Sequence, residues 1–153
     1  IKKIPQDMMI QKTTELGIQK FIPLLCERSV VREINVERAK KIATEASEQS
    51  NRISVPEILK IQDLESFLKS FTEHGHLIFC DINCESSNLK NILSKKDPTC
   101  ILIGPEGDFS ENERQLIVSH KRTASISLAN NILRTETAAI AATTILSYNL
   151  NFK

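Results

Sequence analysis

Two short stretches of the chain combine residue types that could hold a ligand and act on it. The first runs from Ile103 to Asp108, and in it Gly104 and Gly107 bracket a proline and a glutamate. Glycine permits positive φ angles and close approach of a ligand to the backbone, while proline fixes the course of the loop. Neither the G-x-G-x-x-G pattern nor the Walker lysine is present, which disfavours a phosphate-binding loop. A tight turn that leads into a helix is the plainer interpretation.

The second stretch, residues 127–138, is a polar loop with a single arginine, Arg134, followed by the Thr-Glu-Thr of residues 135–137. A helix that starts here would offer free backbone N–H groups, which can hold a carboxylate or a phosphate. The plainer interpretation is a capped helix in which Arg134 pairs with Glu136 or another surface acid. Taken alone, this stretch favours the plainer interpretation.

Hydrophobic periodicity and capping residues predict the elements that position these stretches. The predicted helices cover about 6–16, 36–50, 64–71, 111–120 and 136–147, with a short one near 89–93; their N-caps are Asn35, Asp63, Ser110 and Thr135. The predicted strands are 18–25, interrupted by Pro23, then 76–80, 99–103 and 124–128. This alternation predicts an α/β fold with a mostly parallel sheet covered by helices on both faces.

Ligands of such sheets lie at the carboxyl ends of the strands. The loops that follow Ile103 and Leu128 leave two strands that we predict to be neighbours. We therefore expect the functional site between these two loops.

The composition is that of one ordinary globular domain. The 153 residues are 41% hydrophobic and 25% charged, so they can bury one sizeable core. No apolar run is long enough to cross a bilayer and no signal-peptide pattern opens the chain, so we expect a cytoplasmic protein. A net charge of +1 argues against a chain that binds nucleic acid by itself through a broad electrostatic footprint.

Neither the cysteines nor the histidines have the spacing of metal ligands. Cys80 and Cys84 lack the C-x2-C spacing of a zinc knuckle, and the four cysteines are expected to be buried, reduced thiols. His74, His76 and His120 are not closely spaced with acids and lie outside both stretches. We therefore predict that the protein uses no metal.

Together, the two stretches resemble the signature loops of RsmE-type RNA methyltransferases, which belong to the SPOUT superfamily. Those loops read I-G-P-E-G-x-F-S and L-G-x-x-I-L-R-x-E-T-A, and the two stretches resemble them in order, separation and composition. Further similar blocks lie at residues 12–17, 26–31, 45–52 and 55–58. The resemblance therefore covers nearly the whole chain.

The resemblance implies a methyltransferase that uses S-adenosylmethionine to modify N3 of a uridine in 16S ribosomal RNA of the small subunit. It also implies a SPOUT-type fold with a deep C-terminal trefoil knot. The residues implied to bind the cofactor, largely through backbone groups, are Ile103, Gly104, Pro105, Glu106, Gly107, Leu128, Ile132 and Leu133. The residues implied to lie where the cofactor meets the target base are Arg134, Glu136 and Thr137. Methyl transfer from a sulfonium needs no metal.

The family also suggests two partners for this domain. One is a second copy of the chain, because the active site of these enzymes is completed across a homodimer; the small residues Ala138, Ala139, Ala141 and Ala142 would permit close helix approach. The other is a small N-terminal PUA-like domain that helps to grip ribosomal RNA. No equivalent precedes Ile1, so we expect residues 1–153 to be the methyltransferase domain alone.

Two residues depart from the family pattern, since Asp108 and Ala129 stand where glycines are common. Each narrows the allowed backbone angles, and Ala129 is the greater change because aspartate tolerates left-handed conformations better than alanine. One alternative is therefore a non-catalytic knotted RNA-binding or ribosome-assembly module that has lost cofactor binding. A generic nucleotide-binding α/β domain is a further alternative, disfavoured by the absence of a phosphate loop.

Overall fold

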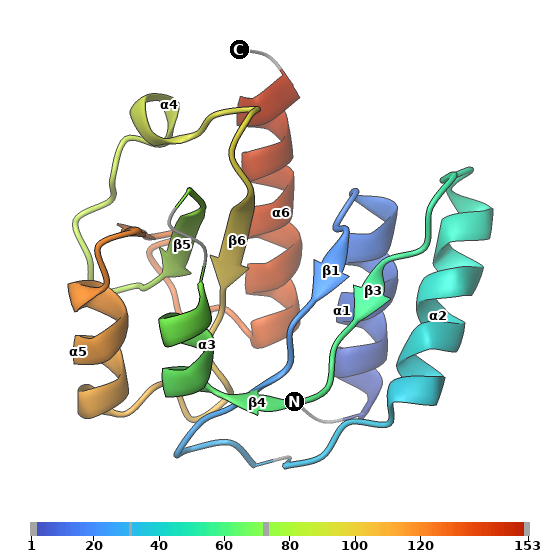
Figure 1. Ribbon diagram of the computed structural model, residues 1–153, viewed down its shortest axis with the longest axis horizontal. Coiled ribbons are helices and arrows are strands. Elements are labelled where there is room, and N and C mark those ends of the chain that lie inside the picture. Colours follow the sequence, from blue (N-terminus) through green and yellow to red (C-terminus); the bar gives the residue numbers. More distant parts are fainter. Residues whose placement is uncertain (1–2, 31, 72–73, 152–153) are drawn as a thin grey trace.

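The computed structural model describes residues 3–30, 32–71 and 74–151, in which helices and strands alternate along the chain (Figure 1). Ile1 and Val31, the last residue of the family block 26–31, lie outside these residues. The elements are α1 (Lys3–Glu15), β1 (Lys20–Phe21), β2 (Leu24–Leu25), α2 (Val36–Gln49), β3 (Glu57–Ile58), β4 (Gln62–Asp63), α3 (Leu64–Ser70), β5 (His76–Cys80), α4 (Leu89–Ile92), β6 (Thr99–Leu102), α5 (Glu111–Ser119), β7 (Thr123–Ile126) and α6 (Thr135–Asn151). Within the described ranges, no helix has the length and apolar character needed to span a membrane.

A parallel three-stranded sheet forms the centre of the fold. β5 lies in the middle and pairs with β6 on one side and β7 on the other. The prediction that the strands preceding the two signature loops are neighbours is therefore wrong, because periodicity carries no information on strand order. Their carboxyl ends still lie at one edge of the sheet, since Leu102 is paired with Phe79 and Ile126 with Cys80.

Helices cover both faces of this sheet, as the sequence predicts. Successive side chains of a strand point to opposite faces. On one face Phe79 packs in a core with Phe67 of α3 and Ile117 of α5. On the other face Ile78 packs with Leu146 of α6. A strand enclosed in this way must be apolar throughout, and residues 77–79 are at most 2% exposed.

The predicted strand 18–25 is split into β1 and β2 by the segment that contains Pro23. β1 pairs in parallel with β3, and β2 with β4. Proline has no backbone N–H to donate, but its carbonyl still accepts a hydrogen bond from Gln62 N at 3.1 Å. The segments 20–25 and 57–63 therefore run side by side across the break. Periodicity did not predict β3 and β4, which are only two residues long.

Three of the four predicted N-caps are confirmed. The side chains of Asn35, Asp63 and Ser110 accept hydrogen bonds from backbone N–H groups in the first turns of α2, α3 and α5. Hydrogen bonds from the backbone N–H and the hydroxyl of Ser66 lower the pKa of Asp63. The charged carboxylate is thus retained at neutral pH beside the positive end of the α3 dipole.

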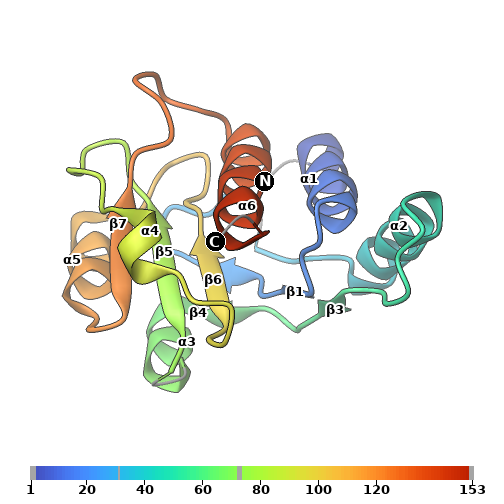
Figure 2. The ribbon, with the colours of Figure 1, turned by 90° about the horizontal axis from the view of Figure 1, so that it is seen from above.

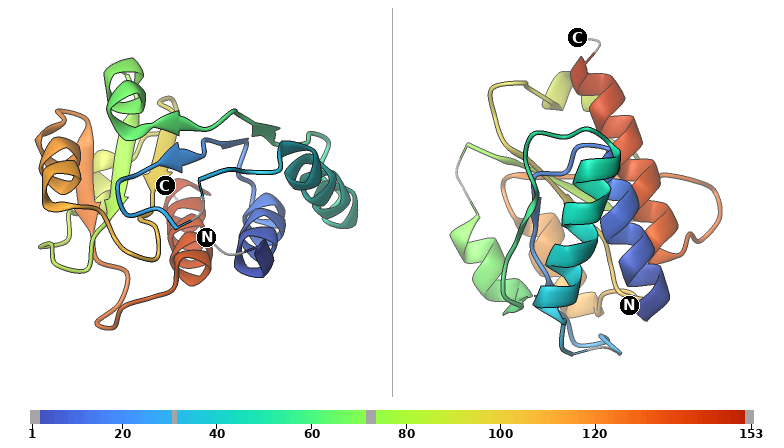
Figure 3. Two further views of the ribbon diagram at one scale, coloured as in Figure 1. Left: turned by 90° about the horizontal axis from the view of Figure 1, so that it is seen from below. Right: turned by 90° about the vertical axis from the view of Figure 1, so that its right-hand side faces the viewer.

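α1 lies between α2 and α6, as the right-hand view in Figure 3 shows. Arg52, from the family block 45–52, donates hydrogen bonds to the carbonyls of Thr14 (2.6 Å) and Ile18 (2.8 Å) and so fixes the turn from α1 toward β1. α6 continues to Asn151, beyond its predicted end at residue 147. The trefoil knot that the resemblance implies stays a prediction.

Candidate functional site

Three loops meet at the carboxyl edge of the central sheet: residues 81–88 after β5, 103–110 after β6 and 127–134 after β7 (Figure 2). Sequence reasoning identified the second and third but missed the first. The backbone N–H of Ser127 donates to Ser86 Oγ at 2.8 Å, and that of Ser87 donates to the carbonyl of Ser125 at 2.9 Å. Loop 81–88 is thus bound to the end of β7. Its position after a buried strand was the signal that could have revealed it.

The first signature loop makes a turn in which Asp108 N donates to the carbonyl of Pro105 at 2.9 Å. Asp108 has a φ of 60°, in the left-handed region that glycine adopts most readily. Its carboxylate accepts a hydrogen bond from Phe109 N at 2.7 Å, which supports this conformation locally. The aspartate therefore reproduces the backbone geometry open to the glycine it replaces.

The other departure, Ala129, requires no unusual geometry. In the described part of the chain, positive φ angles at non-glycine residues occur at Asn51 and Asp108. The carbonyl of Ala129 accepts a hydrogen bond from the Ser127 hydroxyl at 3.3 Å. The second loop thus adopts a conformation that alanine tolerates.

A hydrogen bond joins the two signature loops. The hydroxyl of Thr135 donates to the carbonyl of Gly104 at 3.3 Å, and Thr135 is buried. The prediction that Thr135 is the N-cap of the last helix is wrong, because Thr135 is the first helical residue and its side chain reaches the other loop. The carbonyl of Arg134 instead accepts the first helical hydrogen bond, from Ala138 N at 2.9 Å.

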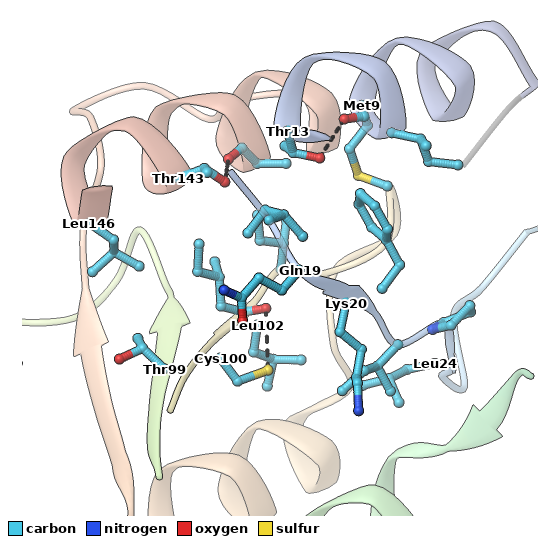
Figure 4. Close-up of a pocket in the computed structure, with 18 of the residues that line it drawn as sticks. Met9, Thr13, Gln19, Lys20, Leu24, Thr99, Cys100, Leu102, Thr143 and Leu146 are labelled. Atoms are coloured by element: carbon cyan, nitrogen blue, oxygen red, sulfur yellow. Dashed lines mark hydrogen bonds between the residues drawn. The ribbon is translucent and has the colours of Figure 1, made fainter. Parts of the chain in front are cut away.

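Residues 103–105 line a cavity of about 1230 Å³ that extends between β6, the 18–24 segment, α1 and α6. Figure 4 shows part of its lining, including Gln19, Cys100 and Thr143. Thr135 also lines the cavity, so the first signature loop and the start of α6 together form one of its walls.

The remaining predicted cofactor residues are not among those that line this cavity. Glu106 and Gly107 are exposed at the tip of the first loop, while Leu128 and Leu133 are half-buried. Ile132 is 87% exposed. The structure therefore brings residues 103–105 to the start of α6, but it does not bring Ile132 into contact with that wall.

The three residues predicted to act on the substrate lie where α6 begins. Arg134 and Thr137 are exposed, and Glu136 is half-buried. Among the residues that the structure describes, Arg134 forms no ion pair, so the alternative pairing with Glu136 is not formed. The guanidinium is thus available to a ligand at the carboxyl edge.

A partly buried ion pair that sequence reasoning missed holds loop 81–88 in place. Asp81 is 7% exposed, and its Oδ2 accepts hydrogen bonds from Arg114 Nε (3.0 Å) and Nη2 (2.6 Å). Its Oδ1 accepts one from Asn83 N at 2.9 Å. Because both carboxylate oxygens are occupied, we assign Asp81 to fixing the loop against α5.

All four cysteines are free thiols. Burial raises the pKa of Cys80 to about 12 and that of Cys26 and Cys100 to about 11. These thiols are therefore protonated at neutral pH and are poor nucleophiles.

The fold and site define an α/β domain with parallel strands and polar loops gathered at one edge of the sheet. The chain belongs to the RNA methyltransferase domain family, whose model matches residues 1–147. The family resemblance drawn from the sequence is confirmed.

Comparison with known proteins agrees with this assignment. Ribosomal RNA small subunit methyltransferase E of Rickettsia conorii is 39% identical over 146 residues, which cover 93% of this chain and 59% of that protein. A crystal structure of the enzyme of that name from Neisseria gonorrhoeae, bound to S-adenosyl methionine, matches with a TM-score of 0.89 and 29% identity, covering 99% of this chain and 64% of that one.

A TrmH/SpoU tRNA modifying enzyme from A. aeolicus matches with a TM-score of 0.53 and 15% identity over 97% of this chain and 68% of that one. At this identity the match shows the shared fold alone, and the predicted SPOUT-type α/β fold is confirmed. The chain spans about three fifths of the length of the curated relatives it matches.

Proposed function

We propose that this chain is the catalytic domain of a methyltransferase that uses S-adenosylmethionine to modify N3 of a uridine in 16S ribosomal RNA. The observation that carries the proposal is the hydrogen bond from Thr135 to Gly104, which joins the two family loops at the carboxyl edge of the sheet. The names of the relatives support a substrate in the small ribosomal subunit, and such a substrate implies a cytoplasmic location.

The residues present fit this cofactor. A Cβ at position 104 would lie 3.2 Å from Asp108 Oδ1 and 3.3 Å from the Phe109 ring, so glycine allows the loop to fold this tightly while residue 104 lines the cavity. Leu128 and Leu133 supply half-buried apolar side chains for a flat heterocycle. When bound, S-adenosylmethionine would supply an electrophilic methyl group on a sulfonium sulfur.

The chain's own residues would act mainly on the target base. Uracil N3 becomes nucleophilic as its proton leaves, and the negative charge spreads onto the two flanking carbonyl oxygens. The exposed guanidinium of Arg134 could stabilise that charge with charge-assisted hydrogen bonds. Glu136 and Thr137 lie on the first turn of α6, where free backbone N–H groups add positive potential. We assign both to the meeting point of cofactor and base.

Cofactor binding separates this proposal from the non-catalytic alternative. We expect isothermal titration calorimetry of the chain with S-adenosylmethionine to detect binding. Gly104→Ala should weaken it, because the added Cβ crowds Asp108 and Phe109. Thr144→Ala, at an exposed position of α6, is the matched control and should bind like the unsubstituted chain. An unsubstituted chain that binds no cofactor at millimolar concentration would favour the non-catalytic RNA-binding or assembly module.

We also propose that the chain forms a homodimer. Of the four alanines predicted to permit close helix approach, Ala141 is half-buried. Ala138, Ala139 and Ala142 are buried within their own protomer. Apolar side chains exposed on α1 and α6 are the better candidates: Ile4 (77%), Met8 (46%) and Tyr148 (63%).

A biological interface there should bury roughly 1,000 Å² or more. Analytical ultracentrifugation at micromolar concentration should show a dimer, and Met8→Glu should shift it toward monomer, whereas Lys41→Glu on the exposed side of α2 should not. A monomer for the unsubstituted chain would exclude the dimer.

We further propose that a PUA-like RNA-binding domain accompanies this domain in the whole protein.

A further inference from the structure

The turn of residues 26–29, just after β2, packs against the first signature loop. Ser29 N donates to the carbonyl of Cys26 at 3.1 Å, and Cys26 N donates to Ser29 Oγ at 3.0 Å. Two hydrogen bonds therefore close a turn of four residues. Its conformation is fixed locally, so it can act as a rigid support for what lies against it.

Glu113 fastens this turn to the first signature loop. Its Oε1 accepts a hydrogen bond from Glu27 N at 2.8 Å, and its Oε2 accepts one from Ser110 N at 2.9 Å. Glu113 is 7% exposed, and charge-assisted hydrogen bonds of this kind are strong when buried. One carboxylate thus fixes the distance between the turn and the end of the loop.

Arg28 then contacts the loop itself. A Cβ at Gly107 would lie 3.0 Å from the backbone oxygen of Arg28 and 3.1 Å from its Cβ, so the two backbones approach as closely as a glycine allows. The guanidinium Nη1 donates to the carbonyls of Gly107 and Phe109, at 3.4 Å in both cases. These two carbonyls flank Asp108, the residue with the left-handed backbone.

We propose that Arg28 is a positioning residue of the cofactor site, which holds the loop at residues 104–109 in the conformation that binds S-adenosylmethionine. This inference rests on the proposed function. Positive φ is less favourable for aspartate than for glycine, so contacts beyond the local hydrogen bond from Phe109 N add to the stability of this conformation. By engaging the carbonyls on both sides of Asp108, Arg28 stabilises that conformation before the cofactor arrives, and a preorganised loop binds more tightly.

The test compares Arg28→Ala, Arg28→Lys and the control Arg32→Ala, an exposed arginine of the same segment. Calorimetry should give a Kd for S-adenosylmethionine about 10-fold higher for Arg28→Ala, with a smaller increase for Arg28→Lys, which keeps the charge but not the planar fork. The rate of methyl transfer at saturating cofactor should change less than about twofold, because Arg28 does not contact the reacting atoms. Arg32→Ala should leave the Kd unchanged.

A second measurement does not depend on the cofactor. The Phe109 amide donates to Asp108 Oδ1, so its hydrogen exchange reports on the loop. In the free protein this exchange should be faster in Arg28→Ala than in the unsubstituted chain. Should Arg28→Ala fail to fold, Arg28→Lys decides by the same two measurements.

Three results would contradict either the positioning role of Arg28 or the proposed function on which it rests. Unchanged cofactor affinity and unchanged exchange in Arg28→Ala would overturn the positioning role. A loss of affinity for RNA alone would also overturn it and indicate a phosphate contact instead. An unsubstituted chain that binds no cofactor would refute the proposed function, and the exchange measurement would then still test whether Arg28 holds the loop.

Discussion

Replacing Arg134 by alanine is expected to slow methyl transfer roughly 100-fold or more while the affinity for S-adenosylmethionine changes little. The guanidinium is exposed at the start of α6 and has no ion-pair partner among the described residues. Its removal should therefore cost the free protein little stability. Its proposed contact is with the negative charge on the base, and this charge develops only as the transition state is reached. Such an interaction affects the rate and not cofactor binding.

The measurement is single-turnover methylation of small ribosomal subunits by the whole protein, with calorimetry on the same variant. Arg134→Lys is the matched control; it retains the charge but loses the planar fork, and we expect an intermediate rate. Near-normal methylation by Arg134→Ala would eliminate the catalytic role. A parallel loss of stability, cofactor affinity and rate would instead indicate that Arg134 only fixes the second loop.

Replacing Phe79 by alanine is expected to lower the free energy of unfolding by about 3–5 kcal/mol. Phe79 is 2% exposed at the centre of β5, so the smaller side chain leaves a cavity in the core. The Phe79 ring also meets the Phe109 ring edge-on, with centroids 5.6 Å apart and an interplanar angle of 69°. Because Phe109 belongs to the first signature loop, the variant should also bind S-adenosylmethionine more weakly.

Denaturant unfolding monitored by circular dichroism measures the first effect and calorimetry the second. Phe79→Leu refills most of the space and should cost clearly less stability, but it lacks the ring contact with Phe109. A loss below about 1 kcal/mol in Phe79→Ala would contradict the assigned core position.

Local signals in the sequence predicted the helices and the three strands of the central sheet. Asn35, Asp63 and Ser110 cap helices because their side chains accept hydrogen bonds from residues only three positions away. The capping box of Ser110 and Glu113 was equally visible in the sequence. What could not be seen is that Glu113 also binds Glu27, since that contact spans 86 positions.

The candidate site was predicted in part for the same reason. The signature loops were found from residue types, but the position of β5 between β6 and β7 depends on tertiary pairing. Thr135 has the side chain of an N-cap, yet its hydroxyl binds a loop 31 positions away. Loop 81–88 has no unusual composition, and only its place at the end of β5 brings it to the site.

The bond between Thr135 and Gly104 has a consequence for how the protein is made. α6 follows the central sheet in the chain, so during synthesis the sheet is complete before Thr135 can bind the first signature loop. The contacts of Arg28 with the first loop and of Glu27 with Glu113 of α5 likewise close chain segments of about eighty residues, and closures of this length are slow to form. A nascent chain that ends before α6 would therefore carry the first loop without its partner. Competence to bind the cofactor should arrive in one step, with the last helix, and cofactor binding by chains of increasing length would report that step.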